Sequence, residues 1–280
     1  MLIRCWGARG SIPVCGPEYL KYGGDTTCIE IRTMTNDIII VDAGSGIRKL
    51  GEQLLTEKRN ELNILFTHLH MDHILGFPFF KPLYDKGKHI NVFGCSFPRD
   101  SIKEILSTAM SSPFFPVSLD DFKAEISFHS VCGDAFSIGS VDITPIFLSH
   151  PNRGFGYKFF ENGQSFVFLT DNELTYKHPG GLEYRDYLSF SEKADLLIHD
   201  AEFTEAEYKQ TRKWGHSVYN VALQLALEAG VKRFGLFHHN QDRTDAALDD
   251  IVRDCRQIIK SGKSTLDCFA LRQGMEIDLK

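Results

Sequence analysis

The chain has 280 residues, of which 42% are hydrophobic and 12% are aromatic, and its formal net charge is −6. This composition is typical of a large globular domain with an ample core, and we expect residues 1–280 to form one domain. A protein that binds nucleic acid mainly through phosphate contacts is usually basic. The negative charge therefore disfavours that class, although a local basic patch would still be compatible with it.

Cysteine usage and the N-terminal sequence bear on the cellular compartment. The seven cysteines are scattered, odd in number, and form no C-x-x-C pair. In a chain that can build its own core, this pattern predicts reduced thiols, mostly buried as small hydrophobic residues. The N-terminal sequence MLIRCW does not resemble a signal peptide, and no apolar run approaches the ~20 residues of a membrane span. We therefore expect a cytoplasmic protein that does not engage a membrane.

Short apolar segments rich in β-branched or aromatic residues predict the strands, and many of them end in Gly, Asn, Asp or Pro. In chain order they are Leu2–Trp6, Cys28–Thr33, Ile38–Val41, Leu62–Thr67, Ile90–Phe93, Glu125–Val131, Val141–Leu148, Phe155–Phe160, Ser165–Thr170, Asp195–His199, Arg233–Phe237 and Leu266–Leu271. The dipeptide Asn162-Gly163 lies between two of these segments and predicts a hairpin turn.

Apolar residues at i, i+3, i+4 and i+7 predict the helices. They cover residues 47–54, 102–110, 218–229 and 247–258. Thr244 is suited to cap the start of the last helix, and Gly262 is suited to end it. Because β-rich and helical stretches alternate along the chain, we expect an α/β fold in which two sheets carry outer helices, not a doubly wound fold.

The most unusual segment is FTHLHMDH, at positions 66–73, which places three histidines and a carboxylate directly after an apolar run. Side chains alternate along a strand, so His68 and His70 point the same way from the strand end, and Asp72 and His73 follow as the chain turns. Neutral imidazole and carboxylate are ligands that Zn²⁺, Fe²⁺ and Mn²⁺ prefer. The spacing therefore predicts a metal site, not a group of surface histidines.

Further ligand-type residues follow other predicted strands. His150 comes after one strand in LSHP, Asp171 after another in FLTDNE, and His238 and His239 after a third in GLFHHN. In an α/β architecture, functional groups collect at such positions just past the strands. We expect these residues to join the segment at positions 66–73.

The H-x-H-x-D-H motif resembles that of the metallo-β-lactamase superfamily, and the downstream order of His150, Asp171 and a terminal histidine matches this family across nearly the whole chain. The segments WGARGSIP, YGGDTTCIEIR and IIIVDAGSGI are also similar to those of its bacterial members. The resemblance implies a four-layer αββα sandwich of two mixed sheets with outer helices. It also implies a site for two divalent metal ions at the edge between the sheets.

The resemblance assigns ligands to both ions. They are His68, His70 and His150 for one ion, Asp72, His73 and His238 for the other, and Asp171 as a bridge. Only the alignment of strand ends favours His238 over His239 as the last ligand. Asp42, in VDAGSG, resembles the family's aspartate beneath the site, where a carboxylate accepts the distal N–H of a ligand histidine. The alternative is that Asp42 is a simple turn residue.

Two features narrow the branch of the superfamily. A bridging carboxylate at Asp171 argues against true β-lactamases, which usually carry cysteine there. The segments LIHDAEFTEAEY and KWGHSVYN resemble those of RNase Z and related phosphodiesterases, in which an acidic residue orients a histidine at the start of a helix. The matching residues are Asp200 and His216. We expect His216 to protonate the leaving alkoxide, with a pKa lowered by the helix dipole, unless the pair merely pins the helix.

The sequence therefore predicts a dinuclear metal-dependent hydrolase, most simply a phosphodiesterase in which a metal-bound hydroxide attacks phosphorus and Asp72 accepts the proton of the bridging water. Zn²⁺ is the expected metal, although the same ligands suit Mn²⁺ and Fe²⁺. Arg153 and Arg9 are candidates for contacts with the phosphate. For Arg153 the alternative is a solvated loop charge.

The expected substrate is small. RNase Z carries a long basic arm, and the stretch between Asp171 and Asp200 holds only three basic residues, Lys177, Arg185 and Lys193. This favours a cyclic nucleotide, a cyclic phosphate or an oligonucleotide end over tRNA. The alternatives are a thioesterase or lactonase of the same fold, and a metal-binding sensor without catalysis. The loop at positions 111–116, SSPFFP, either packs on its own domain or forms a lid or a dimer contact, so a homodimer stays open.

Overall fold

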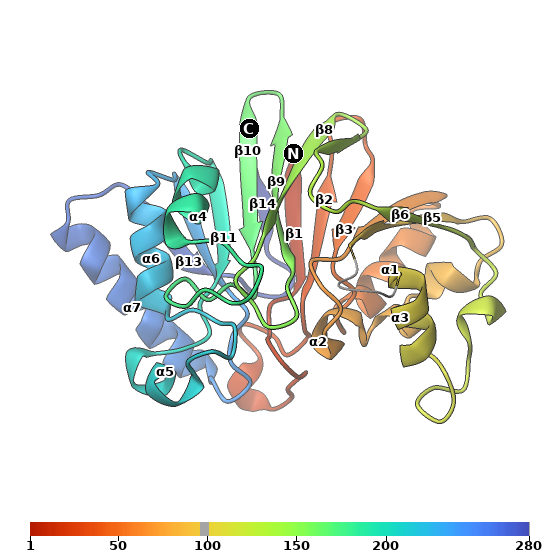
Figure 1. The fold of residues 1–280 in the computed structure, drawn as a ribbon, viewed down its shortest axis with the longest axis horizontal. Coiled ribbons are helices and arrows are strands. Elements are labelled where there is room, and N and C mark those ends of the chain that lie inside the picture. The colour runs from red at the N-terminus through yellow and green to blue at the C-terminus, as the bar shows by residue number, and fades with distance from the viewer. Residues whose placement is uncertain (96–100, 280) are drawn as a thin grey trace.

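Two seven-stranded sheets face each other in this computed structural model, which describes residues 1–95 and 101–279 (Figure 1). The first sheet has the order β14-β1-β2-β3-β4-β5-β6. Its strands are β1 (Leu2–Gly7), β2 (Cys28–Arg32), β3 (Ile38–Val41), β4 (Glu61–Leu65), β5 (His89–Gly94), β6 (Glu125–Ser130) and β14 (Glu276–Asp278). Strands from β14 to β3 pair antiparallel, whereas those from β3 to β6 pair parallel.

The second sheet is built in the same way, in the order β13-β12-β11-β10-β9-β8-β7. Its strands are β7 (Phe136–Ile138), β8 (Val141–Phe147), β9 (Phe155–Glu161), β10 (Gln164–Leu169), β11 (Leu196–Asp200), β12 (Arg233–Phe237) and β13 (Asp267–Ala270). Strands β7 to β10 pair antiparallel, and β10 to β13 pair parallel. Each sheet is therefore mixed, and each has a parallel half whose strands all end at one edge.

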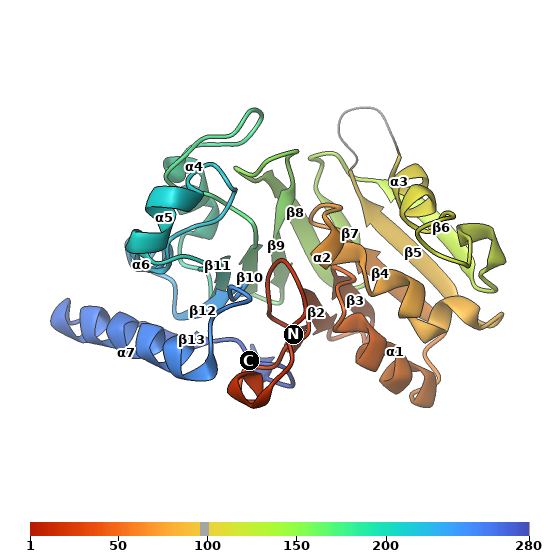
Figure 2. The same cartoon turned by 90° about the horizontal axis from the view of Figure 1, so that it is seen from below.

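Helices cover the outer face of each sheet, which gives the expected four layers (Figures 1 and 2). They are α1 (Ile47–Thr56), α2 (Met71–Ile74) and α3 (Ile102–Ala109) beside the first sheet, and α4 (Tyr184–Ser191), α5 (Glu205–Thr211), α6 (Tyr219–Glu228) and α7 (Asp245–Ser261) beside the second. The α/β sandwich predicted from the sequence is thus confirmed. Among the described residues, no helix combines the length and the hydropathy needed to cross a bilayer.

Three apolar layers hold the sandwich together. The strand β3 packs into two of them, and this explains why its sequence has no polar residue. Ile39 and Val41 pack in the core between the two sheets, whereas Ile38 and Ile40 pack with α1 and α3 on the outer side. A strand buried on both faces must be apolar at every position, which explains the run of β-branched residues. A third core fills the space between the second sheet and helices α4, α6 and α7.

Most predicted elements are present, and local chemistry explains their ends. The Thr244 hydroxyl accepts the N–H of Ala247 and caps α7, and Gly262 follows its last residue, as expected. Asn162 and Gly163 both have positive φ and form the turn between β9 and β10. Five of these strands and helices were not predicted: the three-residue strands β7 and β14, and the helices α2, α4 and α5. The two strands are too short for an alternating pattern, and α5 has no buried residue.

The exposed aromatic loop extends from α3 as expected. Phe114 is largely exposed, whereas the ring of Phe115 lies 5.6 Å from that of Phe79, edge to face, and joins the core beside α1. The loop therefore packs in part on its own domain. Its role as a lid or a dimer contact stays a prediction.

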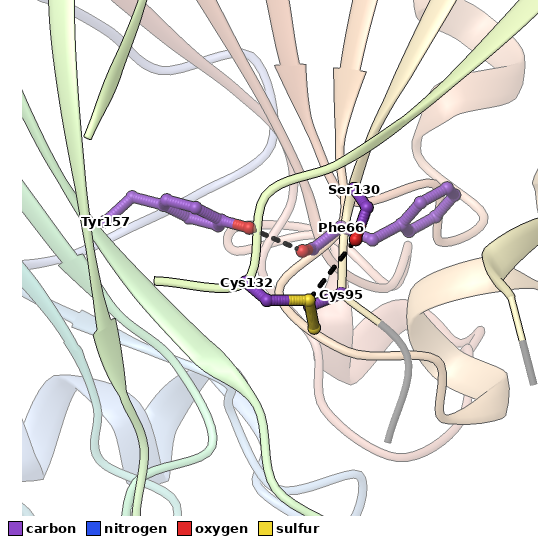
Figure 3. The surroundings of a disulfide bond; sticks show 5 residues. All are labelled: Phe66, Cys95, Ser130, Cys132 and Tyr157. Carbon is purple, nitrogen blue, oxygen red and sulfur yellow. Dashed lines mark hydrogen bonds between the residues drawn. A yellow bond between two sulfur atoms is a disulfide. The ribbon is translucent and has the colours of Figure 1, made fainter. Parts of the chain in front are cut away.

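Two cysteines correct the expectation of reduced thiols throughout. Cys95, just after β5, and Cys132, just after β6, form a disulfide, and the Ser130 hydroxyl lies 3.3 Å from Cys132 Sγ (Figure 3). The ends of parallel neighbours meet at one edge, so residues 37 positions apart come together. Spacing in the sequence could not reveal this.

Near the disulfide, a hydrogen bond links the two sheets. The Tyr157 hydroxyl donates to the Phe66 carbonyl (2.8 Å) and ties β9 to the end of the strand that precedes the histidine motif (Figure 3).

The disulfide makes a testable prediction about thiol count and stability. Protein purified without reductant should expose five thiols when denatured, and seven after reduction. Since the bond closes a loop of 37 residues, Cys132→Ser should lower the free energy of unfolding by about 2–4 kcal/mol, whereas Cys15→Ser, at an exposed free thiol, should leave it unchanged. Thiol titration and denaturant unfolding measure both quantities. Seven reactive thiols before reduction would contradict the assignment.

Candidate metal centre

The parallel strands of both sheets deliver polar residues to one edge. In the first sheet, Asp42 follows β3, and the segment Thr67–His73 follows β4. In the second sheet, Asp171 lies two positions beyond β10, Asp200 is the last residue of β11, and His238 directly follows β12. Sites in such architectures form outside the carboxyl ends of the strands. Residues that are far apart in the sequence therefore meet at this edge.

Three of these strand-end residues have a left-handed backbone. The φ angles are 62° at Asp42, 55° at Asp171 and 53° at His238. A non-glycine residue in this conformation costs roughly 1–3 kcal/mol, and such residues concentrate at functional sites. Each sharp turn lets the side chain leave its sheet and enter the space shared with the other strand ends.

One group at this edge consists of three histidines. His150 Nε2 lies 3.1 Å from His70 Nδ1, and the ring of His68 is 4.5 Å from that of His70 and 4.9 Å from that of His150. Their ligand atoms all lie within 4.8 Å of one another. Burial lowers the pKa of His150 to about 3 and that of His68 well below its usual value. Both rings are therefore neutral, which is the form that binds a metal.

A second, fully buried group combines two histidines with two carboxylates. His73 Nε2 is 3.3 Å from one oxygen each of Asp72 and Asp171, and His238 Nε2 is 3.1 Å from Asp72 and 3.3 Å from Asp171. Asp171 also lies 3.7 Å from His68 Nε2 and thus between the two groups. The structure brings all seven residues proposed from the sequence into one cluster.

Two orphaned atoms test whether this cluster suits a metal. His68 Nε2 and His73 Nε2 are buried and have no hydrogen-bond partner within the described part of the chain. Leaving such an atom unsatisfied costs about 1–3 kcal/mol. Imidazole nitrogen and carboxylate oxygen are donors for Zn²⁺, Mn²⁺ and Fe²⁺, so a cation here would satisfy the nitrogens and offset the carboxylates. The residues present therefore fit divalent metal ions.

Partners outside the cluster set the orientation of its histidines. The Nδ1–H of His73 donates to Asp42 (2.8 Å), and the hydroxyl and amide of Thr67 donate to the same carboxylate. The Nδ1–H of His150 donates to the Gly215 carbonyl (3.0 Å). In each of these two rings, the bond from Nδ1–H leaves the Nε2 atom unprotonated, with its lone pair directed toward the centre. Asp42 is thus more than a turn residue: it fixes the ring of His73.

The sequence did not identify Glu202, whose carboxylate orients the ring of His238 as Asp42 orients the ring of His73. Its Oε2 accepts the Nδ1–H of His238 (2.9 Å), and its Oε1 accepts from the Asn240 amide (3.0 Å). Glu202 lies just beyond β11, the position that singled out the other site residues. In the sequence, however, it belongs to the acidic run AEFTEAE, where Glu205 and Glu207 occupy the first turn of α5. Nothing local distinguished it from these helix-terminal carboxylates.

His216 reaches the centre from a loop. It lies before α6, which starts only at Tyr219, because pairing between Phe203 and Val218 holds that segment extended. The expectation that His216 begins the helix is therefore wrong. Its Nδ1 is 3.3 Å from Asp200 Oδ2 and 3.4 Å from an oxygen of Glu202.

The expected pKa of His216 is also wrong in direction. Burial disfavours the imidazolium, but the negative charges of Glu202 and Asp200 outweigh it and raise the pKa of His216 to about 9. The ring is held in its protonated form by two carboxylates, not in its neutral form by a helix dipole. Asp200 also accepts backbone N–H groups from Asn172 and Ser217, so it pins this loop as well.

Glu173 was also missed, and it fixes the loop that carries His216. Its buried carboxylate accepts the amide N–H groups of Lys213 (2.8 Å) and Gly215 (2.9 Å) and lies 2.7 Å from His178 Nε2. A side chain at Gly215 would meet the ring of His150, so only glycine permits this approach. Glu173 follows Asp171 by two residues, but its sequence context gave no sign of a partner some 40 residues away.

Two further candidates lie away from the centre. Arg9 is fully buried, and its guanidinium donates to the carbonyls of Gly23, Asn240 and Arg243, so in this structure it ties turns together and does not face a substrate. The reason is local: Arg9 is directed to the carbonyl of Gly23, whereas Ser11, two residues further along the same turn, donates its amide to Asp72. His239 Nε2 donates to the Leu271 carbonyl (2.8 Å) on the far side of the backbone.

Arg153 remains near the centre. It lies beside Gly180 and lines a small cavity together with His68 and His70. The geometry thus places it where a substrate group could contact it, and its role stays a prediction.

Comparison with known proteins identifies the family. The family model described as beta-lactamase superfamily domain matches residues 38–239. The chain belongs to this superfamily. Ribonuclease Z of Picrophilus torridus is 22% identical to it, over 98% of this chain and 94% of that protein. The superfamily fold implies divalent metal ions, and the buried histidines and aspartates are suited to hold them.

Solved structures of the superfamily share the fold. The metallo-beta-lactamase fold protein YhfI from Bacillus subtilis has a TM-score of 0.72 and 16% identity, covering 99% of this chain and 98% of that one. A diphosphatase from the PhnP family has a TM-score of 0.71 and 16% identity, covering 100% and 98%. These neighbours confirm the sandwich predicted from the sequence.

The orienting carboxylates give a prediction for metal affinity. Glu202→Gln and Asp42→Asn each remove the charge that holds one Nδ1–H, so each should weaken metal binding by about 10–100-fold. Glu205→Gln, at a carboxylate just outside the centre, is the matched control and should bind metal as the wild type does. Competition with a chromophoric chelator measures the affinity. Equal affinities for all four proteins would refute this role of the two carboxylates.

Proposed function

We propose that the chain is a metal-dependent hydrolase that cleaves phosphodiesters, with residues 1–280 acting as one domain. The observation that carries this proposal is His216, a proton donor held by Asp200 and Glu202 beside the metal-type cluster. Hydrolysis of an ester with an alkoxide leaving group needs such a donor. The similarity to ribonuclease Z, an enzyme whose name denotes cleavage of RNA, supports the same reaction class.

The proposed metal ligands form two sets. They are His68, His70 and His150 for one ion, Asp72, His73 and His238 for the other, and Asp171 between them. We propose Zn²⁺ as the metal, with Mn²⁺ and Fe²⁺ as alternatives of the same donor preference. Two such ions, when bound, supply Lewis acidity for the phosphoryl oxygens and lower the pKa of water.

The residues of the chain itself position and move protons. Asp72, whose Oδ2 accepts the amide N–H of Ser11 (3.0 Å), is fixed where it can accept the proton of the attacking water. His216 gives its proton to the departing oxygen, and Asp200 and Glu202 keep it charged until then. His68 and His150, whose pKa values are lowered by burial, stay neutral beside Asp171.

We propose a small substrate: a cyclic nucleotide, a cyclic phosphate or an oligonucleotide end. The stretch between Asp171 and Asp200 contains the short helix α4 and no long arm. Of its basic residues, Lys177 pairs with Glu183, and Lys193 with Glu192. These paired charges offer little to an RNA backbone, which supports a small substrate over a folded RNA.

The first test is hydrolysis of bis(p-nitrophenyl) phosphate. Metal-loaded protein should cleave it, and both removal of the metal with a chelator and His68→Ala should reduce the rate on the order of 100-fold or more. His89→Ala, at an exposed histidine paired with Glu125, is the control and should retain full activity. Release of p-nitrophenolate measures the rate. A wild-type protein with full metal occupancy and no activity would contradict the proposal.

The second test isolates His216 through the leaving group. A p-nitrophenolate leaves without a proton, whereas a ribose alkoxide needs one, so His216→Ala should slow cleavage of a ribose ester by about 10²–10⁴-fold and affect the p-nitrophenyl ester far less. Because the pKa of His216 is raised to about 9, its protonated form persists at neutral pH and is lost only when the pH rises above about 9. Ribose-ester cleavage should therefore fall as pH rises through about 9, and His216→Ala should abolish that limb.

Two other functions are separated by these measurements. A thioesterase or lactonase of the same fold would turn over its ester equally well in the wild type and His216→Ala, and would not cleave phosphodiesters. A metal-binding sensor would bind metal tightly and turn over none of these substrates.

A further inference from the structure

Two cavities of different chemistry are lined in part by residues of the centre. The larger, about 580 Å³, is lined by His216 and Glu202 and also by Ser11, whose amide contacts Asp72. The smaller, about 180 Å³, is lined by His68, His70 and Arg153. Since a phosphodiester carries two substituents, each cavity has room for one of them. Which substituent enters which cavity decides which bond breaks.

Charge distinguishes the larger cavity. Three carboxylates line it, those of Glu202, Glu207 and Asp242, and none of its described lining residues is Lys or Arg. Glu202 and Glu207 have cationic partners, in His216 and Arg243, whereas Asp242 is exposed. A second phosphate would be repelled here. An uncharged group with hydroxyls to donate would be accommodated.

An aromatic side chain gives the larger cavity a flat surface. Trp214 lines it and remains 62% exposed. Its neighbours Lys213 and Gly215 both have positive φ, at 75° and 99°, and Glu173 accepts both of their amides. The backbone on either side of Trp214 is therefore fixed, although its ring is uncovered. Exposed rings held in this way are the platforms on which nucleobases stack.

Gln241, which also lines the larger cavity, holds Asp242 in place. Oε1 of Gln241 is inaccessible to solvent and has no hydrogen-bond partner among the described residues, while its amide nitrogen donates to Asp242 (3.1 Å). Because this oxygen is covered, Gln241 contributes to the cavity through the amide that holds Asp242. Size also favours the larger cavity as a ligand site. Its volume of about 580 Å³ falls within the ~300–1,000 Å³ typical of such sites, whereas the smaller cavity, of about 180 Å³, does not.

We propose that the larger cavity binds the leaving alcohol as an uncharged nucleoside, with its base on Trp214 and its ribose toward the carboxylates. The smaller cavity, beside Arg153, takes the substituent that stays on phosphorus. Of the three proposed substrate types, the assignment applies to an oligonucleotide end, because a cyclic phosphate has no separate leaving alcohol. This assignment rests on the proposed function, since His216 lines the nucleoside cavity and can protonate only an oxygen that lies there. Water adds to phosphorus, the bond between phosphorus and the nucleoside oxygen breaks, and the proton of His216 completes the nucleoside hydroxyl.

Adenosine 5′-methyl phosphate tests this polarity because its two alcohols leave with similar ease. Cleavage toward the larger cavity gives adenosine and methyl phosphate, whereas the opposite orientation gives AMP and methanol. Metal-loaded wild type should give at least about 10-fold more adenosine than AMP, the scale of one base–aromatic stack. Trp214→Ala should bring the ratio toward one, and Trp214→Phe should largely restore it. Chromatography of the products measures the ratio independently of the overall rate.

A matched aromatic variant controls for general damage. Phe160→Ala, at a half-exposed ring at the far end of β9, should keep the wild-type ratio. The assignment is overturned if AMP and methanol dominate or if Trp214→Ala leaves the ratio unchanged. It is also overturned if the protein cleaves bis(p-nitrophenyl) phosphate but does not cleave the adenosine ester.

Binding of adenosine tests the cavity without any catalysis. The chain has two tryptophans, and Trp6 is largely covered and donates to Glu30. Adenosine should therefore quench the fluorescence of Trp214 in metal-loaded protein, with saturation that Phe160→Ala leaves intact, and Trp214→Phe should remove the signal. If bis(p-nitrophenyl) phosphate is not cleaved, the proposed function fails. The fluorescence measurement still decides whether the larger cavity binds adenosine. Absence of saturable quenching would overturn the nucleoside site.

Discussion

Burying several imidazoles and carboxylates in one small space is the constraint that organises this protein. Ionisable groups without water are unfavourable unless each charge is offset and each polar atom has a partner. Asp171 lies between the two histidine groups, while Asp42 and Glu202 hold His73 and His238 from outside. The two orphaned ring nitrogens show that protein atoms alone do not complete this compensation. A divalent cation, which the superfamily fold implies, would complete it.

The two sheets divide this task. Each has a parallel half whose strands end at the shared edge, so each contributes an aspartate or a histidine just past a strand and a carboxylate that orients a histidine. In the first sheet that carboxylate, Asp42, follows β3; in the second, Glu202 follows β11. The left-handed turns at Asp42, Asp171 and His238 cost energy that only the packed cores on both sides of each sheet can offset.

The sequence was informative wherever a pattern was local. Apolar runs located the long strands, and the position just past each strand located the candidate ligands, because both depend on nearest neighbours along the chain. Contacts between distant segments left no such trace. Glu202 and Glu173 resembled ordinary loop and helix-end carboxylates, Cys95 and Cys132 resembled scattered thiols, and Arg9 resembled an available cation until its three carbonyl acceptors were in view. Which of the adjacent residues His238 and His239 faces the centre became clear only from the fold.

The arrangement also separates the metal chemistry from the choice of substrate. The residues that fit the ions lie on strand ends and on the segment at positions 66–73, whereas Trp214 lies on a loop that holds no proposed ligand, and Gln241 and Asp242 lie three and four residues beyond His238. The loop of Trp214 is anchored by Glu173 and Asp200, so its tip can differ while the centre stays intact. Relatives of one fold can thus share a cleavage reaction and differ in what they cleave. In this chain, the acidic, aromatic side of the centre is where such a difference would be encoded.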